Sequence, residues 1–212
     1  MKTNQLINAI AADAKAPSIP ISTTVLFAAG IGIIATGLLF WTMLPVRGDM
    51  GAAMGDWRFL MKWAFSLSLL LTGIAMAISL ARPQWSPSSK LLLLLTGPAI
   101  LAIGVVAELI SLPASDWMPT MVGTAPIACL VYVPLLSGLP LALMIIALRR
   151  GAPARPAAAG AVAGVIAVGI AATFYATHCQ NDSPLFLAAW YIISTVIVAS
   201  IGAILGARLL RW

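Results

Sequence analysis

The sequence predicts an all-α, polytopic membrane protein with six transmembrane helices and both termini in the cytoplasm. Of its 212 residues, 61% are hydrophobic and only 8% are charged, and the mean hydropathy is +1.03. Soluble domains carry about 25% charged residues. The apolar residues form continuous runs near the roughly 20 residues that cross a bilayer, without the alternation of barrel strands. A helical bundle in a membrane is therefore the predicted fold.

The N-terminal residues form the only sizeable polar segment of the chain. We expect residues 1–20 to be a cytoplasmic tail, followed by a transmembrane domain over residues 21–212. Leu6, Ile7 and Ile10 share one face of a short amphipathic helix in this tail. A helix this short is marginal in water, so it should either lie on the bilayer or bind a partner protein.

Six apolar runs follow the tail, and each is long enough to span the membrane. Proline interrupts the third run at Pro98 and the fourth at Pro134 and Pro140, which invites kinks there. We place the runs at residues 23–44, 59–81, 90–112, 126–148, 157–177 and 185–210.

The fifth and sixth runs each contain a GxxxG motif, at Gly160 with Gly164 and at Gly202 with Gly206. Such surfaces let two helix backbones approach closely. The motifs predict either a tight hairpin of these two spans or the face of a homodimer.

Orientation follows from the distribution of charge, because short cytoplasmic loops are enriched in Lys and Arg. Arg47, Arg58 and Lys62 fall on one predicted side with five of the six acidic residues. That side is expected to be outside. The cytoplasmic side receives Lys2, Lys15, Arg82, Lys90, Arg149, Arg150, Arg155, Arg208 and Arg211. These basic residues are scattered at span ends, so we expect no direct binding of nucleic acid.

A turn between the fifth and sixth runs holds most of the candidate chemistry. It contains His178, which is the only histidine, and Cys179, which is one of two cysteines. The other, Cys129, begins the fourth run and is predicted to reach the same outer face. The two thiols could form a disulfide, bind a thiophilic metal with His178 as a third ligand, or remain two ordinary buried thiols.

Two ionisable residues lie about one helical turn inside the predicted outer boundary, Lys62 in the second run and Glu108 in the third. Charges at that depth are costly unless they pair or reach the interface. They are expected either to form an intramembrane ion pair or to extend separately to the surface.

No enzyme signature is present. The sequence lacks CxxC, HExxH, GxSxG and Walker motifs, and a single histidine excludes catalysis by a histidine pair. We therefore expect a protein that is not an enzyme and requires no cofactor.

Several stretches resemble one family closely. They are Lys2-Thr3 with Leu6-Ile7, ALRRGAP at 147–153, YATHC at 175–179, DSPLF at 182–186 with Trp190-Tyr191, and the terminal LLRW. Together they are similar to the NrsF (DUF1109) family of bacterial inner-membrane anti-sigma factors. The chain departs from that pattern at Gln180-Asn181, where a proline and an acidic residue are expected.

This resemblance implies a function and a partner. The protein would hold an extracytoplasmic-function (ECF) sigma factor at the membrane and release it when heavy metal or oxidative stress acts on Cys129 and Cys179, with a thiophilic metal ion as signal. The tail residues, or Arg149 and Arg150 on the inner loops, would bind the partner. The alternative from another class is a small transporter or metal-efflux component with a Cys/His entry site.

Overall fold

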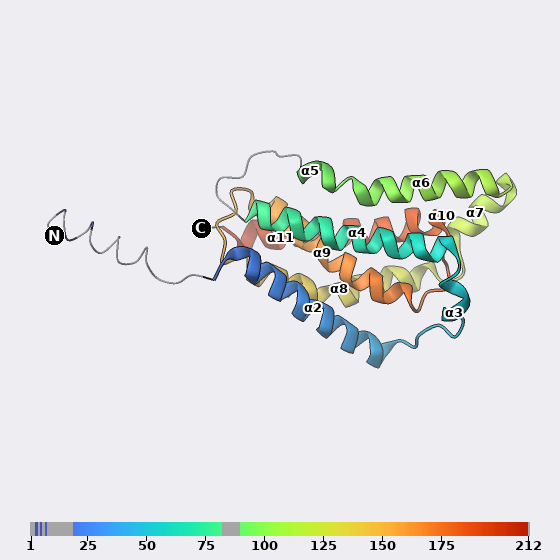
Figure 1. Ribbon diagram of the computed structural model, residues 1–212, viewed down its shortest axis with the longest axis horizontal. Coiled ribbons are helices and arrows are strands. Elements are labelled where there is room, and N and C mark those ends of the chain that lie inside the picture. Colours follow the sequence, from blue (N-terminus) through green and yellow to red (C-terminus); the bar gives the residue numbers. More distant parts are fainter. Residues whose placement is uncertain (1–2, 4, 6, 8–18, 82–89, 212) are drawn as a thin grey trace.

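The computed structural model describes residues 3, 5, 7, 19–81 and 90–211. It shows an elongated bundle of helices whose long members run side by side (Figure 1). The described residues contain no β-strand. The long helices are α2 (Ile21–Met43), α4 (Trp57–Leu80), α6 (Thr96–Ser111), α8 (Pro126–Leu148), α9 (Pro156–Ala176) and α11 (Ile192–Leu209). The shorter ones are α3 (Met50–Ala53), α5 (Lys90–Leu93), α7 (Ala114–Val122), α10 (Pro184–Phe186) and the π-helical turn η1 (Leu187–Tyr191).

Five of the predicted spans are confirmed as long apolar helices. They are α2, α4, α8, α9 and the continuous helical run Pro184–Leu209, which joins α10, η1 and α11. Helices α8, α9 and α10 each begin at a proline, whose fixed φ suits the first helical turn and whose missing N–H costs nothing there. A multi-pass helical membrane protein follows from these five helices.

The region predicted as the third span differs from the others. It is divided into α5 and α6, with a turn at Leu94 and Leu95 between them. Pro98 lies in the first turn of α6 and has no N–H to bond the carbonyl of residue 94. The helix therefore restarts at Thr96, two residues before this proline, and α6 alone is 16 residues long.

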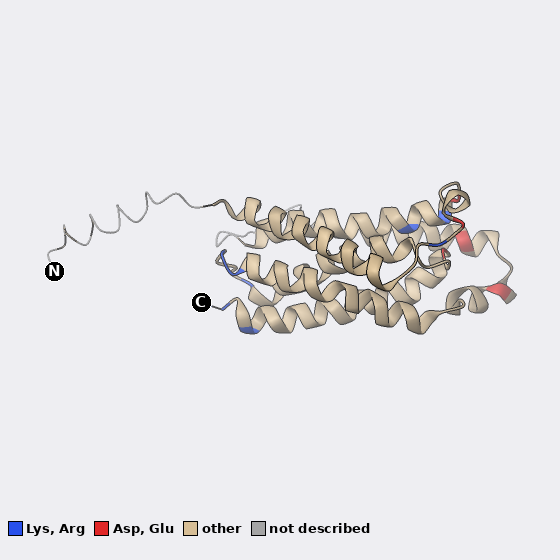
Figure 2. Cartoon of the chain, turned by 90° about the horizontal axis from the view of Figure 1, so that it is seen from below, with Lys and Arg blue, Asp and Glu red and all other residues tan. Residues whose placement is uncertain are grey.

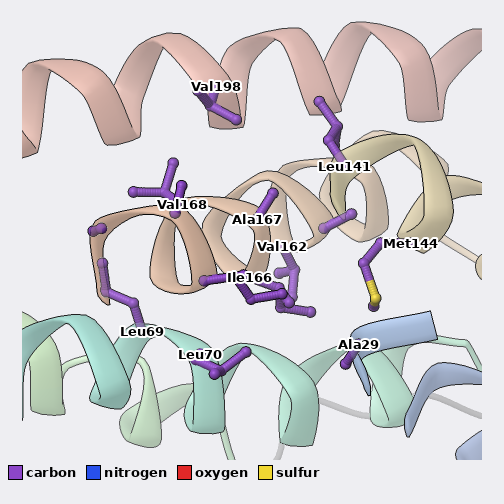
Figure 3. Close-up of a cluster of buried hydrophobic side chains, with 14 of the residues drawn as sticks. Ala29, Leu69, Leu70, Leu141, Met144, Val162, Ile166, Ala167, Val168 and Val198 are labelled. Atoms are coloured by element: carbon purple, nitrogen blue, oxygen red, sulfur yellow. The ribbon is translucent and has the colours of Figure 1, made fainter. Parts of the chain in front are cut away.

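Helix α9 forms the centre of the bundle. It packs against α11, α4, α8 and α2. In an 18-residue apolar stretch of α9, 67% is buried, whereas the corresponding value for α2 is 28%. Figure 3 shows Ile166 facing Leu70 across the contact with α4, and Val168 facing Val198 across the contact with α11. Small and branched side chains on all sides of α9 thus let it contact four neighbours at once.

The two GxxxG motifs pack against each other within the chain. A Cβ added at Gly160 would overlap the carbonyl oxygen of Gly202, and one added at Gly206 would overlap that of Pro156. At Gly164 the nearest atom would be the carbonyl oxygen of Val198, at 2.6 Å. The predicted hairpin of the fifth and sixth spans is therefore present. A homodimer stays a prediction that this packing does not require.

We expect Gly160→Leu to destabilise the bundle severely. The new side chain would meet backbone rather than a movable side chain, so the cost should exceed the roughly 1–3 kcal/mol typical of overpacked cores. Gly138→Leu in α8 is the matched control, because no atom lies within 4 Å of a Cβ there. SDS unfolding of the purified protein should separate the two variants, and equal stabilities would contradict the close α9–α11 contact.

Charge divides the bundle into two ends (Figure 2). Most of the described Lys and Arg residues lie at the end where α2 begins and α8 and α11 stop, which we call the basic end. The described Asp and Glu residues lie at the opposite end, which we call the corner end. Three basic residues, Arg47, Arg58 and Lys62, lie at the corner end in ion pairs with acidic residues.

Candidate functional site

The predicted turn is a compact corner of residues 177–183 between α9 and α10. The backbone N–H of Cys179 bonds the carbonyl of Tyr175 at the end of α9. The hydroxyl of Ser183 accepts a hydrogen bond from the N–H of Leu185 at 3.2 Å and caps α10. Two helix ends therefore fix the corner from both sides.

Both predicted sensor cysteines are buried at this end of the bundle. Cys129, in the first turns of α8, has no exposed surface, and Cys179 is 5% exposed. Both are free thiols. Both belong to the same buried hydrophobic core. The fold thus places at one end of the bundle two unpaired thiols that lie 50 positions apart in the chain.

Three tyrosine rings, from α8, α9 and η1, lie together near the same end of the bundle. The Tyr175 ring lies 6.3 Å from that of Tyr132 and 6.4 Å from that of Tyr191, between centroids. Tyr191 belongs to the π-helical turn η1, and such turns often occur at functional sites. Its hydroxyl is buried and bonds no group among the described residues. A buried hydroxyl without a partner costs about 1–3 kcal/mol.

His178 is directed to the loop after α2. Its Nδ1 lies 2.7 Å from the carbonyl oxygen of Pro45. A carbonyl can only accept, so Nδ1 carries a proton and donates this hydrogen bond. Within the described part of the chain, no three His, Cys, Asp or Glu side chains are grouped to hold a metal ion. His178 therefore does not join the thiols in a preformed three-ligand set.

The predicted ion pair between Lys62 and Glu108 is wrong, because each residue has another partner. The ammonium of Lys62 donates to a carboxylate oxygen of Asp182 at 2.8 Å and to the carbonyls of Cys179 and Asn181 at 2.9 and 3.1 Å. The Lys62 side chain is fully buried. Lys62 therefore bonds the corner to α4 from inside the bundle.

Glu108 pairs instead with Arg58, through Nε at 2.8 Å. Arg58 and Lys62 are four residues apart and share one face of α4, but Lys62 lies one turn deeper. Glu108 on α6 forms its ion pair with Arg58, which lies nearer the end of the bundle, whereas Lys62 bonds residues of the corner. Sequence position gave the depth of these charges but not the neighbouring element that each one faces.

Arg47 is the functional candidate that the sequence analysis missed. Its guanidinium donates to Asp182 at 2.6 Å, to the Cys179 carbonyl at 3.3 Å, and through two nitrogens to Asp49 at 2.7 and 2.8 Å. One feature of the sequence could have indicated Arg47. It is one of three basic residues on the predicted outer side, where five acidic residues also lie.

These pairs shift the titration of the loop groups. Hydrogen bonding to Asp49 is the largest cause that raises the pKa of Arg47 above its usual range. The guanidinium lowers the pKa of Asp49 to about 2. Because the pKa of this carboxyl is lowered on folding, the pair contributes fully above about pH 4. Its contribution is lost only as the pH falls towards 2, so it persists at neutral pH.

An open cavity leads from the surface to the corner. It has a volume of about 390 Å³ and is lined by residues that include Arg47, Thr124, His178 and Cys179. Small solutes can therefore approach Cys179 from the corner end.

The predicted partner-binding residues lie away from this site. Arg149 and Arg150 are exposed and end α8 at the basic end. Ile7 is exposed, while Leu6 and Ile10 lie outside the described residues. The thiols and the candidate partner residues on α8 are therefore at opposite ends of the bundle.

Comparison with known proteins gives matches over nearly the whole chain. The family model described as "Negative regulator of sigma F" (NrsF) matches residues 10–212. The probable anti-sigma-F factor NrsF of Azospira oryzae is 32% identical over 220 residues. The anti-sigma-F factor NrsF of Caulobacter vibrioides is 33% identical over 216 residues. Both alignments cover 100% of each chain. No solved structure matches the chain.

Proposed function

We propose, because this chain belongs to the NrsF family of negative regulators of sigma F, that it retains an ECF sigma factor at the membrane. We further propose that the sigma factor is released when a thiophilic metal ion or an oxidant acts on Cys129 and Cys179. Membership of a family of regulators also confirms the prediction that the protein is not an enzyme.

The proposed topology has six spans with both termini in the cytoplasm. The concentration of Lys and Arg at the basic end supports this orientation. In this topology α5 and α6 together supply the remaining span, the third in chain order, since Lys90 to Ser111 covers 22 residues, or about 33 Å at the helical rise of 1.5 Å per residue. The corner end is then the outer face.

The observation that carries the sensor proposal is that Cys129 and Cys179 are both buried in the core at the corner end. Two thiolates on one ion favour soft metals, and in an oxidising envelope two thiols can also be converted to a disulfide. The open cavity that Cys179 lines supplies a route of entry.

The tail is the proposed site of sigma-factor binding, and its deletion tests this assignment. Removing residues 1–16 should release the sigma factor constitutively, because no other cytoplasmic segment predicted from the sequence offers an apolar helical face. Co-purification of the sigma factor with the membrane protein, together with transcription from its target promoters, measures the effect.

The matched control changes charge on the inner loop and leaves the tail in place. Arg149→Gln with Arg150→Gln removes two exposed cations at the end of α8. If this variant loses the sigma factor while the deletion retains it, the binding surface lies on the loops and not on the tail.

A transport function receives less support from the arrangement of charges. Among the described residues, the fully buried charged side chains are Lys62 and Glu108, and both lie near the corner end. A proton or ion pathway needs ionisable or polar groups that continue across the bilayer. Metal-dependent flux in reconstituted vesicles would nevertheless reverse this preference.

A further inference from the structure

The loop after α2 is bonded to the corner that carries Cys179. We call residues 44–49 the strap. The backbone N–H of Arg47 donates to the carbonyl of Thr177 at 2.9 Å, and His178 bonds the carbonyl of Pro45 at 2.7 Å. The Arg47 side chain adds bonds to the Cys179 carbonyl and to Asp182. A displacement of the corner should therefore displace the strap as well.

The carbonyl of Cys179 lies between two cations. It accepts from Lys62 at 2.9 Å and from Arg47 at 3.3 Å, and the two oxygens of Asp182 are divided between the same two side chains. Lys62 belongs to α4, which packs on the central helix α9. Arg47 belongs to the strap. A change in the backbone at Cys179 must therefore alter its bonds to α4, to the strap, or to both.

Helix α2 is the element best able to move in response. It is the least buried of the five long spans and lies at the edge of the bundle (Figure 1). One end joins the strap, and the other, at Ile21, directly follows the tail. Moving α9 would instead disturb contacts with four other helices.

We infer that Arg47 is a positioning residue for signalling, which couples the corner to α2 and hence to the tail. This inference rests on the proposed function. When a cadmium ion binds, each thiol releases its proton to water and each sulfur forms a bond to the metal. The corner shifts as the two sulfurs close on the ion, Arg47 carries the shift into the strap, and α2 moves at the edge of the bundle.

The experiment measures the movement of α2 directly in the full chain in lipid nanodiscs. Ketone-reactive spin labels on p-acetylphenylalanine at Ile34 in α2 and Leu71 in α4 leave both cysteines free, and these positions are 66% and 63% exposed. In the otherwise unaltered chain, cadmium should shift the label distance by about 1–2 Å or more, the scale of helix shifts in switching proteins. It should weaken sigma-factor retention roughly 5- to 150-fold.

Arg47→Gln should remove both responses while cadmium still binds the thiols, as measured by their protection from alkylation. Asp49→Asn is the matched control, because it removes the partner of Arg47 within the strap and leaves the bonds to the corner. This variant should respond as the unaltered chain does. Arg47→Lys keeps the charge but not the planar guanidinium that bonds several groups at once, so it should show a reduced distance shift. This variant tests the inference if Arg47→Gln does not fold.

The outcomes separate the inference from the proposed function. A distance shift in the unaltered chain that survives in Arg47→Gln or is undiminished in Arg47→Lys overturns the role of Arg47, as does a static α2 despite bound cadmium. A shift of α2 that depends on Arg47, without any release of the sigma factor, supports the coupling and contradicts the proposed function.

Discussion

Replacing either Cys129 or Cys179 by serine should abolish release of the sigma factor by cadmium or oxidant and leave its retention intact. A hydroxyl neither forms a disulfide nor provides the soft thiolate that such metals prefer. The full coupling, of about 1–3 kcal/mol or 5- to 150-fold in affinity, should therefore disappear in each single variant. A reporter for the sigma-dependent promoters measures induction, and co-purification measures retention.

Alanine at the same positions is the control for packing. Both cysteines are buried in the core, so serine also introduces a polar group, which alanine does not. If serine and alanine variants are equally uninducible and equally able to retain the sigma factor, the lost thiol is the cause. Persistent induction in the double variant would remove the cysteines from the sensor role.

Much of the fold could be predicted because bilayer physics leaves few choices. A chain that crosses hydrocarbon must satisfy its backbone within each segment, so apolar length alone located α2, α4, α8, α9 and α11. The GxxxG motifs predicted a close helix–helix contact. Small residues do not indicate whether the partner helix belongs to the same chain or to a second copy. Pro98 was noted as an interruption, yet sequence alone did not show that it divides the span.

The site could be predicted only in part. Charge placement correctly put Cys129, Cys179, Lys62 and Glu108 towards one end. It failed for their partners, because periodicity gives the depth of a residue along a helix and not which neighbour it faces. Asp182, for example, is bonded both to Lys62 on α4 and to Arg47 of the strap. The π-helical turn that holds Tyr191 near Tyr175 has no clear sequence signal.

Lys62→Met should destabilise the protein by up to about 3–5 kcal/mol, the cost of removing one partner of a buried ion pair when the other is left uncompensated. The substitution removes three hydrogen bonds from a side chain with no exposed surface. Asp182, only 11% exposed, would keep Arg47 as its remaining cation. SDS unfolding in detergent micelles at neutral pH gives the difference in free energy.

The double variant distinguishes a lost ion pair from lost packing. Lys62→Met combined with Asp182→Asn removes both charges, so it should be more stable than the sum of the two single effects predicts. A coupling energy near zero would mean that Lys62 acts mainly through the carbonyls of Cys179 and Asn181. In either case, the corner that carries Cys179 should become more accessible to alkylating reagents, because a buried cation that holds its backbone has been removed.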